Sequence, residues 1–398
     1  MRTAQNKLGV LFAASAILTS KTYFLLFFVL AIFWFMSRIR ELPNILISVA
    51  SPLLLMLGSG LFFGLENDQY NFFKDLWYVA KVIVIITLGV FIGTNSEFCI
   101  SSLRTIAIIA SIVSLPELFE VFGNGFVSLG SLSVITFGGL VIVPFYMEHS
   151  RRIDGDPLLM QWVIVLPILM TVALSLSRTS ILILLISWLG ARGLLQSIGK
   201  ALAIGVIILI FFGIIIPFLP SYNLEEITFL AKIRNSIQEI SFVSNADSEQ
   251  ITANWRGYES FMAYQQWQSG SFMKKIFGQG IGTTIDIGIY YPLYGNNSEL
   301  VRYLPILHNG YFMILVKYGI FGLLMFIIFL LRLLRAPCNP YNSSSVFAKH
   351  LSFTTSLLML ITMASITGPL NISIMDSITL LCGWAIGIQY KTLKLIDQ

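Results

Sequence analysis

His308 and Asn309 form a polar pair directly before a long apolar segment, in the stretch HNGYFMILVKYGIFG. If that segment is a membrane-spanning helix, the pair lies at its mouth, and Gly319 and Gly322 lie roughly two to three turns deeper at about 1.5 Å per residue. Small residues there let a neighbouring helix approach closely, so a catalytic pair would be held on a rigid, tightly packed helix. An imidazole at a helix mouth also suits an interfacial or capping role, and the spacing leaves both interpretations open.

Arg178 is a second candidate, in the turn LSLSRTS just before an apolar run that opens at Thr179. A helix N-terminus presents unpaired backbone N–H groups and the positive end of the helix dipole. Arg178, Thr179 and Ser180 therefore suit a cradle for a phosphate group. An arginine that reaches up to lipid head groups fits the same position.

The composition places these residues in a membrane protein. Of 398 residues, 56% are hydrophobic and only 11% are charged, whereas soluble domains carry about 25% charged residues. The mean hydropathy is +0.81. The three cysteines show neither a disulfide framework nor zinc-ligand spacing, so no metal site is expected. We therefore predict an all-α integral membrane protein.

Apolar runs of about 18 to 22 residues mark the candidate spans, with a few shorter ones treated as spans as well. The runs lie at residues 8–20, 22–37, 43–64, 76–93, 101–119, 129–147, 158–175, 179–193, 199–218, 308–331, 349–367 and 371–391. Basic residues gather in alternate connections, such as Arg151 and Arg152, which places these connections and both termini in the cytoplasm. We expect about twelve transmembrane helices, in 1–218 and 308–398, around one large extracytoplasmic loop, 219–307, that contains short helices.

The loop 219–307 carries eight acidic and six basic residues. Its charge is therefore close to balance, and the net charge of +5 reflects anchoring at the cytoplasmic face rather than nucleic-acid binding. An amphipathic helix is expected at 224–243. The glycine-rich segment 277–284 lacks the Lys-Ser/Thr of a phosphate-binding loop and is expected to be a turn that returns the chain to the membrane.

A second helix is expected within the loop at 252–270, where aromatic residues recur at every third position and include Trp255 and Tyr258. Such a row suits anchoring at the membrane interface or packing on the mouths of the spans better than it suits stacking on sugars. Arg256 lies in the first turn of this helix. Glu259 follows one turn later, where it suits a base, although it is expected to pair with Arg256.

Charged side chains inside spans are costly in a bilayer, so each is a candidate for function. Lys81 lies just inside the outer face and is expected to add positive charge to an outward-facing pocket. Lys317 and Asp376 are expected to form a structural ion pair between two helices.

These motifs together resemble the O-antigen ligase/polymerase superfamily. The resemblance rests on the twelve spans, the S-x-S-R turn that ends at Arg178, Arg256 on a loop helix, the glycine turn 278–282 and the HN-x9-GxxG pattern from His308. It implies a glycosyltransferase at the periplasmic face of the bacterial inner membrane. The implied donor is an oligosaccharide on undecaprenyl diphosphate, and neither a metal nor a nucleotide sugar is needed.

By this similarity, Arg178 and Arg256 bind the diphosphate and His308 acts at the acceptor. Paired arginines suit a departing diphosphate because they donate bidentate, charge-assisted hydrogen bonds. An imidazole suits removal of the acceptor proton or orientation of the acceptor hydroxyl. The residues expected to line the substrate site are Arg178, Arg256, Thr179, Ser180, Asn309, Lys81, Trp255 and Tyr258.

Three functions fit to different degrees. A polymerase would use a second lipid-linked repeat as acceptor, and the aromatic-rich loop favours it because it suits a growing glycan. A ligase would use a lipid A core sugar. A transporter is disfavoured because the two halves of the chain are unlike. The expected partners are the lipid-linked donor, the bilayer, the acceptor glycan and a chain-length regulator, with no nucleic acid.

Overall fold

The structure is a computed structural model that describes the larger part of the chain. The described residues are 44–95, 100–124, 137–152, 157–175, 177–215, 218, 251, 254–292, 300–335, 340–370 and 375–394. The predicted spans at 8–20 and 22–37 and the predicted surface helix at 224–243 lie outside the described residues.

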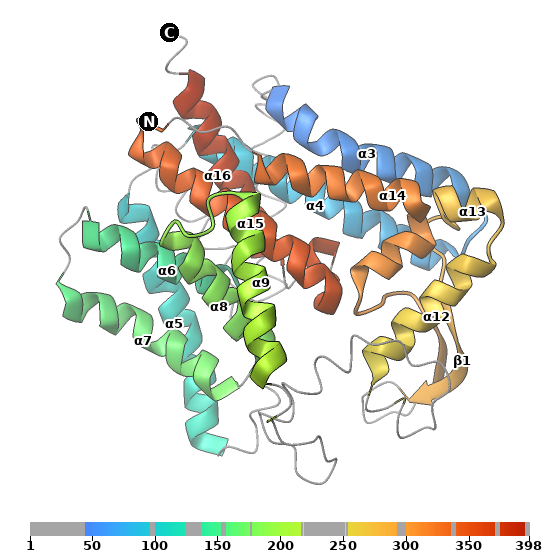
Figure 1. Ribbon diagram of the computed structural model, residues 1–398, viewed down its shortest axis with the longest axis horizontal. Coiled ribbons are helices and arrows are strands. Elements are labelled where there is room, and N and C mark those ends of the chain that lie inside the picture. Colours follow the sequence, from blue (N-terminus) through green and yellow to red (C-terminus); the bar gives the residue numbers. More distant parts are fainter. Residues whose placement is uncertain are drawn as a thin grey trace.

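Helices dominate the described chain (Figure 1). They are α3 (Asn44–Gly64), α4 (Gln69–Asn95), α5 (Ile100–Asn124), α6 (Phe137–Arg152), α7 (Leu158–Ser175), α8 (Arg178–Ala191), α9 (Ile198–Ile215), α12 (Trp255–Ser269), α13 (Phe272–Phe277), α14 (Gly310–Leu334), α15 (Ser343–Ile366), the 3-10 turn η4 (Gly368–Leu370) and α16 (Asp376–Lys394). Each of the ten predicted spans between residues 43 and 391 overlaps one of these helices within the described residues.

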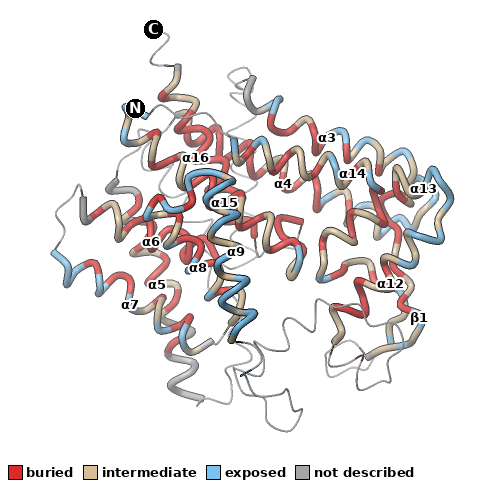
Figure 2. Tube along the Cα trace, in the orientation of Figure 1, coloured by how far each residue is buried: buried red, intermediate tan, exposed pale blue. Residues whose placement is uncertain are grey.

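Five described helices are long and apolar enough to cross a bilayer, so the chain is a multi-pass membrane protein. They are Ile47–Gly64, Gln69–Thr94, Ile198–Ile215, Gly310–Leu334 and Ser343–Ile366. The count of twelve spans and the extracytoplasmic side of 219–307 remain predictions. The helix α9 is exposed along most of its length (Figure 2), which suits a helix that faces lipid.

The centre of the bundle is the contact between α4 and α16, and α16 is buried along most of its length. Two glycines on each helix make this contact, at spacings of four residues: Gly89, Gly93, Gly383 and Gly387. A side chain on any of the four would strike backbone of the other helix. The two GxxxG faces therefore bring the backbones together, as small residues do in membrane helix pairs.

Two buried ion pairs replace the one expected from the sequence. Lys81 Nζ lies 2.7 Å from Asp376 Oδ1 and joins α4 to α16, whereas Lys317 Nζ lies 2.6 Å from Asp75 Oδ1 and joins α14 to α4. The predicted pairing of Lys317 with Asp376 is therefore wrong. Each lysine instead pairs with another nearby carboxylate, because a buried charge needs a close partner.

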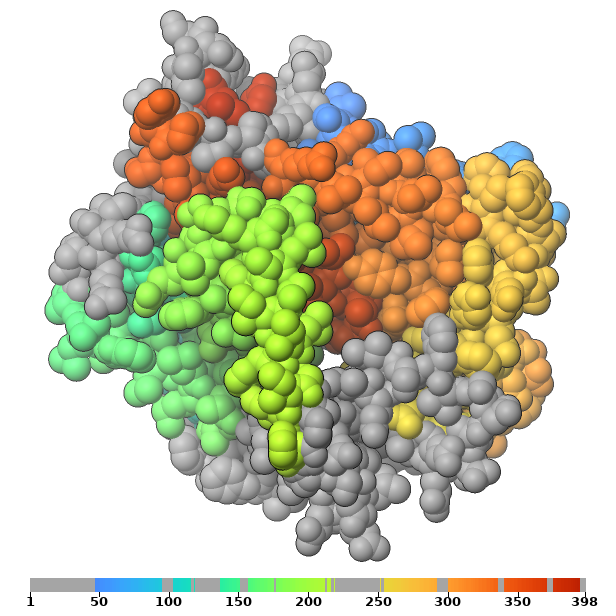
Figure 3. All heavy atoms as spheres, in the orientation of Figure 1, coloured from blue at the N-terminus to red at the C-terminus, as the bar shows by residue number. Residues whose placement is uncertain are grey.

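The loop region contains strands as well as helices, so the all-α expectation is wrong at this point. Strand β1 (Ile285–Pro292) pairs antiparallel with β2 (Leu300–Leu304), with Ile285 opposite Leu304. Ile285 and Ile287 are fully buried, and strand β1 packs on α12. This β-hairpin and α12 form one edge of the molecule beside α14 (Figure 3).

Candidate active site

Glu259 and His308 form a hydrogen-bonded pair at the mouth of α14. His308 Nδ1 lies 2.9 Å from Glu259 Oε2, and the backbone N–H of His308 donates to the same oxygen at 3.2 Å. The carboxylate is buried, while the imidazole side chain is 47% exposed. In the tautomer that carries its proton on Nδ1, the imidazole donates to Glu259, and Nε2 is then the nitrogen that can accept a proton from a bound hydroxyl.

This contact corrects the predicted partner of Glu259. The sequence favoured Arg256, three residues earlier, as the partner of Glu259. In the structure Glu259 instead forms a hydrogen bond with His308, 49 residues further along the chain. Arg256 and Glu259 lie one turn apart on α12, where side chains three residues apart are neighbours. Arg256 therefore lies one turn from the residue that contacts His308.

The segment that carries His308 is fixed from both sides. Thr367, the C-cap of α15, donates its backbone N–H to the His308 carbonyl at 2.9 Å and its hydroxyl to the Leu307 carbonyl at 2.6 Å. Asn309 is the N-cap of α14, and its Oδ1 accepts from the N–H groups of Tyr311 and Phe312. Because the oxygen of Asn309 caps the helix, its amide NH2 is the part that suits the predicted binding role.

Lys317 connects the chain before His308 to helix α4 of the bundle. Its ammonium group donates to both oxygens of Asp75, at 2.6 and 2.7 Å, and to the Pro305 carbonyl at 2.6 Å. Asp75 Oδ2 also accepts the backbone N–H of Gly282 at 2.7 Å. One buried ion pair therefore positions both the chain that leads into His308 and the glycine turn.

The glycine turn packs into a break in α14. Gly319 adopts φ 66°, ψ −167° inside the helix, and the chain at Ile276 to Gly278 lies directly against it. The N–H groups of Gln279 and Gly280 donate to the carbonyls of Val316 and Lys317, which a continuous helix would pair internally.

Two expectations change as a result. The chain that packs against Gly319 is the end of the short helix α13 and the start of this turn, rather than a second span, and α14 is not the continuous rigid helix that the sequence suggested. The segment is a turn as predicted, but the chain that leaves it enters β1 instead of returning to the membrane.

Arg178 lies at the same end of the bundle as His308. Gly190 lies against Thr354 and Gly193 against His350, so α8 and α15 run antiparallel. Counted from the contact between Gly190 and Thr354, Arg178 lies twelve residues towards the start of α8, and Thr367 lies thirteen residues towards the end of α15. At about 1.5 Å per residue both distances are roughly 18 to 20 Å, so Arg178 reaches the level of Thr367, which holds His308.

The start of α8 fits part of the predicted phosphate cradle. The helix begins at Arg178, one residue before the predicted start, and Ser177 is its N-cap. The Ser177 hydroxyl accepts from the N–H of Ser180 at 3.3 Å, and Ser180 is buried. The helix cap thus uses the N–H of Ser180, while Arg178 and Thr179 are only partly buried.

The aromatic side chains of α12 pack within the protein. Trp255 stacks on Tyr291 of the hairpin with ring centroids 4.2 Å apart. Tyr258 donates its hydroxyl to the Ile287 carbonyl at 2.7 Å, and burial, followed by the charge of Asp286, raises the pKa of Tyr258. The packing interpretation of this row therefore agrees with the structure. Lys81 lies in the bundle core, paired with Asp376 and only 1% exposed, so a role in binding substrate remains a prediction.

The comparisons with known proteins give one family. Residues 163–327 match the family model described as O-antigen ligase. The matched segment runs from α7 into α14 and contains Arg178, Arg256, Glu259 and His308. No curated protein and no solved structure matches the chain.

Proposed function

We propose that the chain is a periplasmic-face glycosyltransferase of the bacterial inner membrane, and the match of its segment 163–327 to the O-antigen ligase family model supports this proposal. It transfers a glycan from undecaprenyl diphosphate to a sugar hydroxyl. The observation that carries the proposal is the Glu259–His308 pair at the mouth of α14, with Arg256 one turn from Glu259. A base and a phosphate-binding group meet there.

The reaction is a displacement at the anomeric carbon. The acceptor hydroxyl oxygen forms a bond to that carbon while the bond from the carbon to the diphosphate oxygen breaks. His308 Nε2 takes the hydroxyl proton, and Glu259 stabilises the imidazolium that results, as a buried carboxylate does in other base-assisted transfers. Undecaprenyl diphosphate leaves with one more negative charge, which Arg256 and Arg178 stabilise. Neither a metal ion nor a nucleotide sugar takes part.

The acceptor decides between two functions. We propose two candidate acceptors, the first a second lipid-linked repeat, which a repeat-unit polymerase uses. The aromatic row that favoured a polymerase in the sequence packs on the hairpin and α14, so it no longer supports that choice. The description of the matched family as O-antigen ligase favours the second candidate, a ligase that uses a lipid A core sugar.

Reconstitution in proteoliposomes tests both. The purified protein receives a lipid-linked donor with either a second lipid-linked repeat or a lipid A core as acceptor. A ladder of products supports the polymerase, and a single transfer to the core supports the ligase. His308→Ala and Arg256→Ala should each remove transfer, and full transfer by either variant would refute its assigned role. Lipid-linked repeats that accumulate on the cytoplasmic side in cells carrying His308→Ala would instead support a flippase.

A further inference from the structure

A groove of about 660 Å³ lies between α12 and the hairpin, on the same face of α12 as Glu259. Glu259, Met262 and Gln266 are spaced three and four residues apart, and residues so spaced share a helix face. Along the helix axis, the groove thus begins at Met262, about 4.5 Å from Glu259, and continues about 10 Å further to Ser269.

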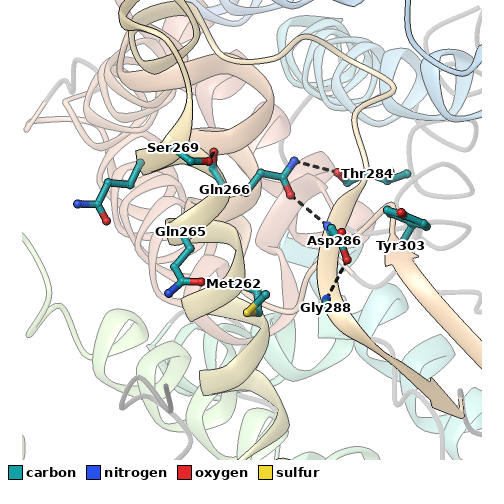
Figure 4. A pocket seen from close by; sticks show the side chains of 9 residues that line it. Met262, Gln265, Gln266, Ser269, Thr284, Asp286, Gly288 and Tyr303 are labelled. Atoms are coloured by element: carbon teal, nitrogen blue, oxygen red, sulfur yellow. Dashed lines mark hydrogen bonds between the residues drawn. The ribbon is translucent and has the colours of Figure 1, made fainter. Parts of the chain in front are cut away.

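Most of the residues that line the groove are polar and uncharged, and their side chains also present apolar surface to it (Figure 4). Gln266 reaches across the groove and donates to the Thr284 carbonyl while it accepts from the N–H of Asp286, each at 3.0 Å. The only charged side chain in the lining is Asp286, and Arg302 neutralises it through two hydrogen bonds of 2.8 and 2.9 Å. A neutral ligand fits this lining better than a phosphate does.

Several groups in the lining remain available to a ligand. The side-chain amides of Gln265 and Gln268 have no hydrogen-bond partner within the described part of the chain, and both side chains are exposed. Each amide offers donors and an acceptor, as sugar hydroxyls require. Tyr303 presents a ring that is 53% exposed. The volume is within the range of about 300 to 1,000 Å³ of ligand sites.

We propose that this groove binds neutral sugar rings of the glycan chain, away from the bond that is formed, with Tyr303 as a stacking surface and Gln265 and Gln268 as hydrogen-bonding groups. This inference rests on the proposed function, since it assigns the path of that enzyme's glycan. The groove leads away from His308, so it holds sugars beyond the reacting one. Its contribution therefore grows with the length of the chain that is bound.

The test compares Tyr303→Ala with Tyr290→Ala. Both tyrosines are exposed on the hairpin, at 53% and 65%, but only Tyr303 lines the groove. Tyr303→Ala should raise the KM for a long glycan about tenfold and leave kcat and the KM for a single-sugar substrate unchanged. Tyr290→Ala should match the wild type throughout. One set of assays uses a donor with a long glycan and a short acceptor, and the other uses a donor with a short glycan and a long acceptor. The set in which Tyr303→Ala raises the KM identifies whether the donor glycan or the acceptor glycan lies in the groove.

A binding measurement separates this inference from the proposed function. The probe is the oligosaccharide released from the donor lipid, without its diphosphate, titrated against the detergent-purified protein. Tyr303→Ala and Gln265→Ala/Gln268→Ala should weaken its binding, and inorganic pyrophosphate should not compete. Equal binding by all variants, with wild-type transfer intact, overturns the groove assignment alone. Binding that depends on Tyr303 in a protein that transfers no glycan to either acceptor overturns the proposed function and leaves a glycan-binding groove.

Discussion

Replacing Lys317 by Met should destabilise the protein more than almost any other single change. Its ammonium group makes three hydrogen bonds, and Lys317 and Asp75 are only 1% and 3% exposed. Loss of the cation leaves the Asp75 carboxylate buried without its partner, which costs about 3 to 5 kcal/mol. The Pro305 carbonyl also loses its donor, which costs about 1 to 3 kcal/mol more. Asp75→Leu should destabilise the protein by a comparable amount, because it leaves the Lys317 ammonium group and the N–H of Gly282 buried without their acceptor.

The double variant Lys317→Met/Asp75→Leu gives the decisive comparison. It removes both charges together, so the remaining cost is that of two unpaired backbone groups, about 2 to 6 kcal/mol. The double variant should therefore be no less stable than either single variant, measured by SDS-induced unfolding in mixed micelles. A destabilisation equal to the sum of the two single effects would show that the residues do not act as a pair, and would refute this reasoning.

The same double variant also tests whether the ion pair positions His308. Lys317 holds the Pro305 carbonyl three residues before His308, so glycan transfer by the double variant should stay low even where its stability recovers. Wild-type transfer by a stable double variant would limit the ion pair to a role in folding.

Three further predictions concern other parts of the site. Glu259→Gln keeps an acceptor for the imidazole but removes the charge, so kcat for glycan transfer should fall about 100-fold with little change in KM, and an unchanged kcat would remove the carboxylate from the mechanism. Gly280→Ala should cost at least about 2 kcal/mol in the SDS unfolding assay, because Gly280 has φ 87° and a Cβ would strike the backbone of α3; a variant of wild-type stability would contradict that contact. Hydrogen bonds from Arg302 hold the pKa of Asp286 below its usual value of 3.8, so the pair stabilises the hairpin above that pH and loses this effect as the pH falls through the lowered pKa. Trp255 fluorescence should report that transition, and a transition above pH 4 would assign it to another group.

The sequence located the helices well but not their neighbours. A run of about 20 apolar residues reports the thickness of a bilayer directly, and α3 and α7 coincide almost residue for residue with the predictions. Which helices touch depends on the packing of the whole bundle, so the ion-pair partners could not be predicted from the sequence. Asp75 shows the difficulty, because the predicted span began at residue 76 and left this carboxylate outside the membrane region, although α4 begins at Gln69.

The sequence predicted which residue types form the candidate site, but it did not predict all of the contacts between them. His308 and Arg256 were found from their positions, and the structure places them near each other through Glu259. The true partner of Glu259 is 49 residues away, and a sequence favours the local partner because helical spacing is the only geometry it displays. The hairpin did leave a signal, the alternation Ile285, Ile287, Ile289, which is the period of a strand and was outweighed by the helical pattern around it.

The interruption of α14 at Gly319 divides that helix mechanically. The nine residues from Gly310 to Tyr318 are fastened to the glycine turn and, through Gly280 and Ile281, to the end of α3. The residues beyond Gly319 have anchors of their own, because Phe326, Phe329 and Leu330 are buried in the bundle. We therefore expect a change in the tilt of this second part to bend α14 at Gly319 and to leave the segment before it aligned.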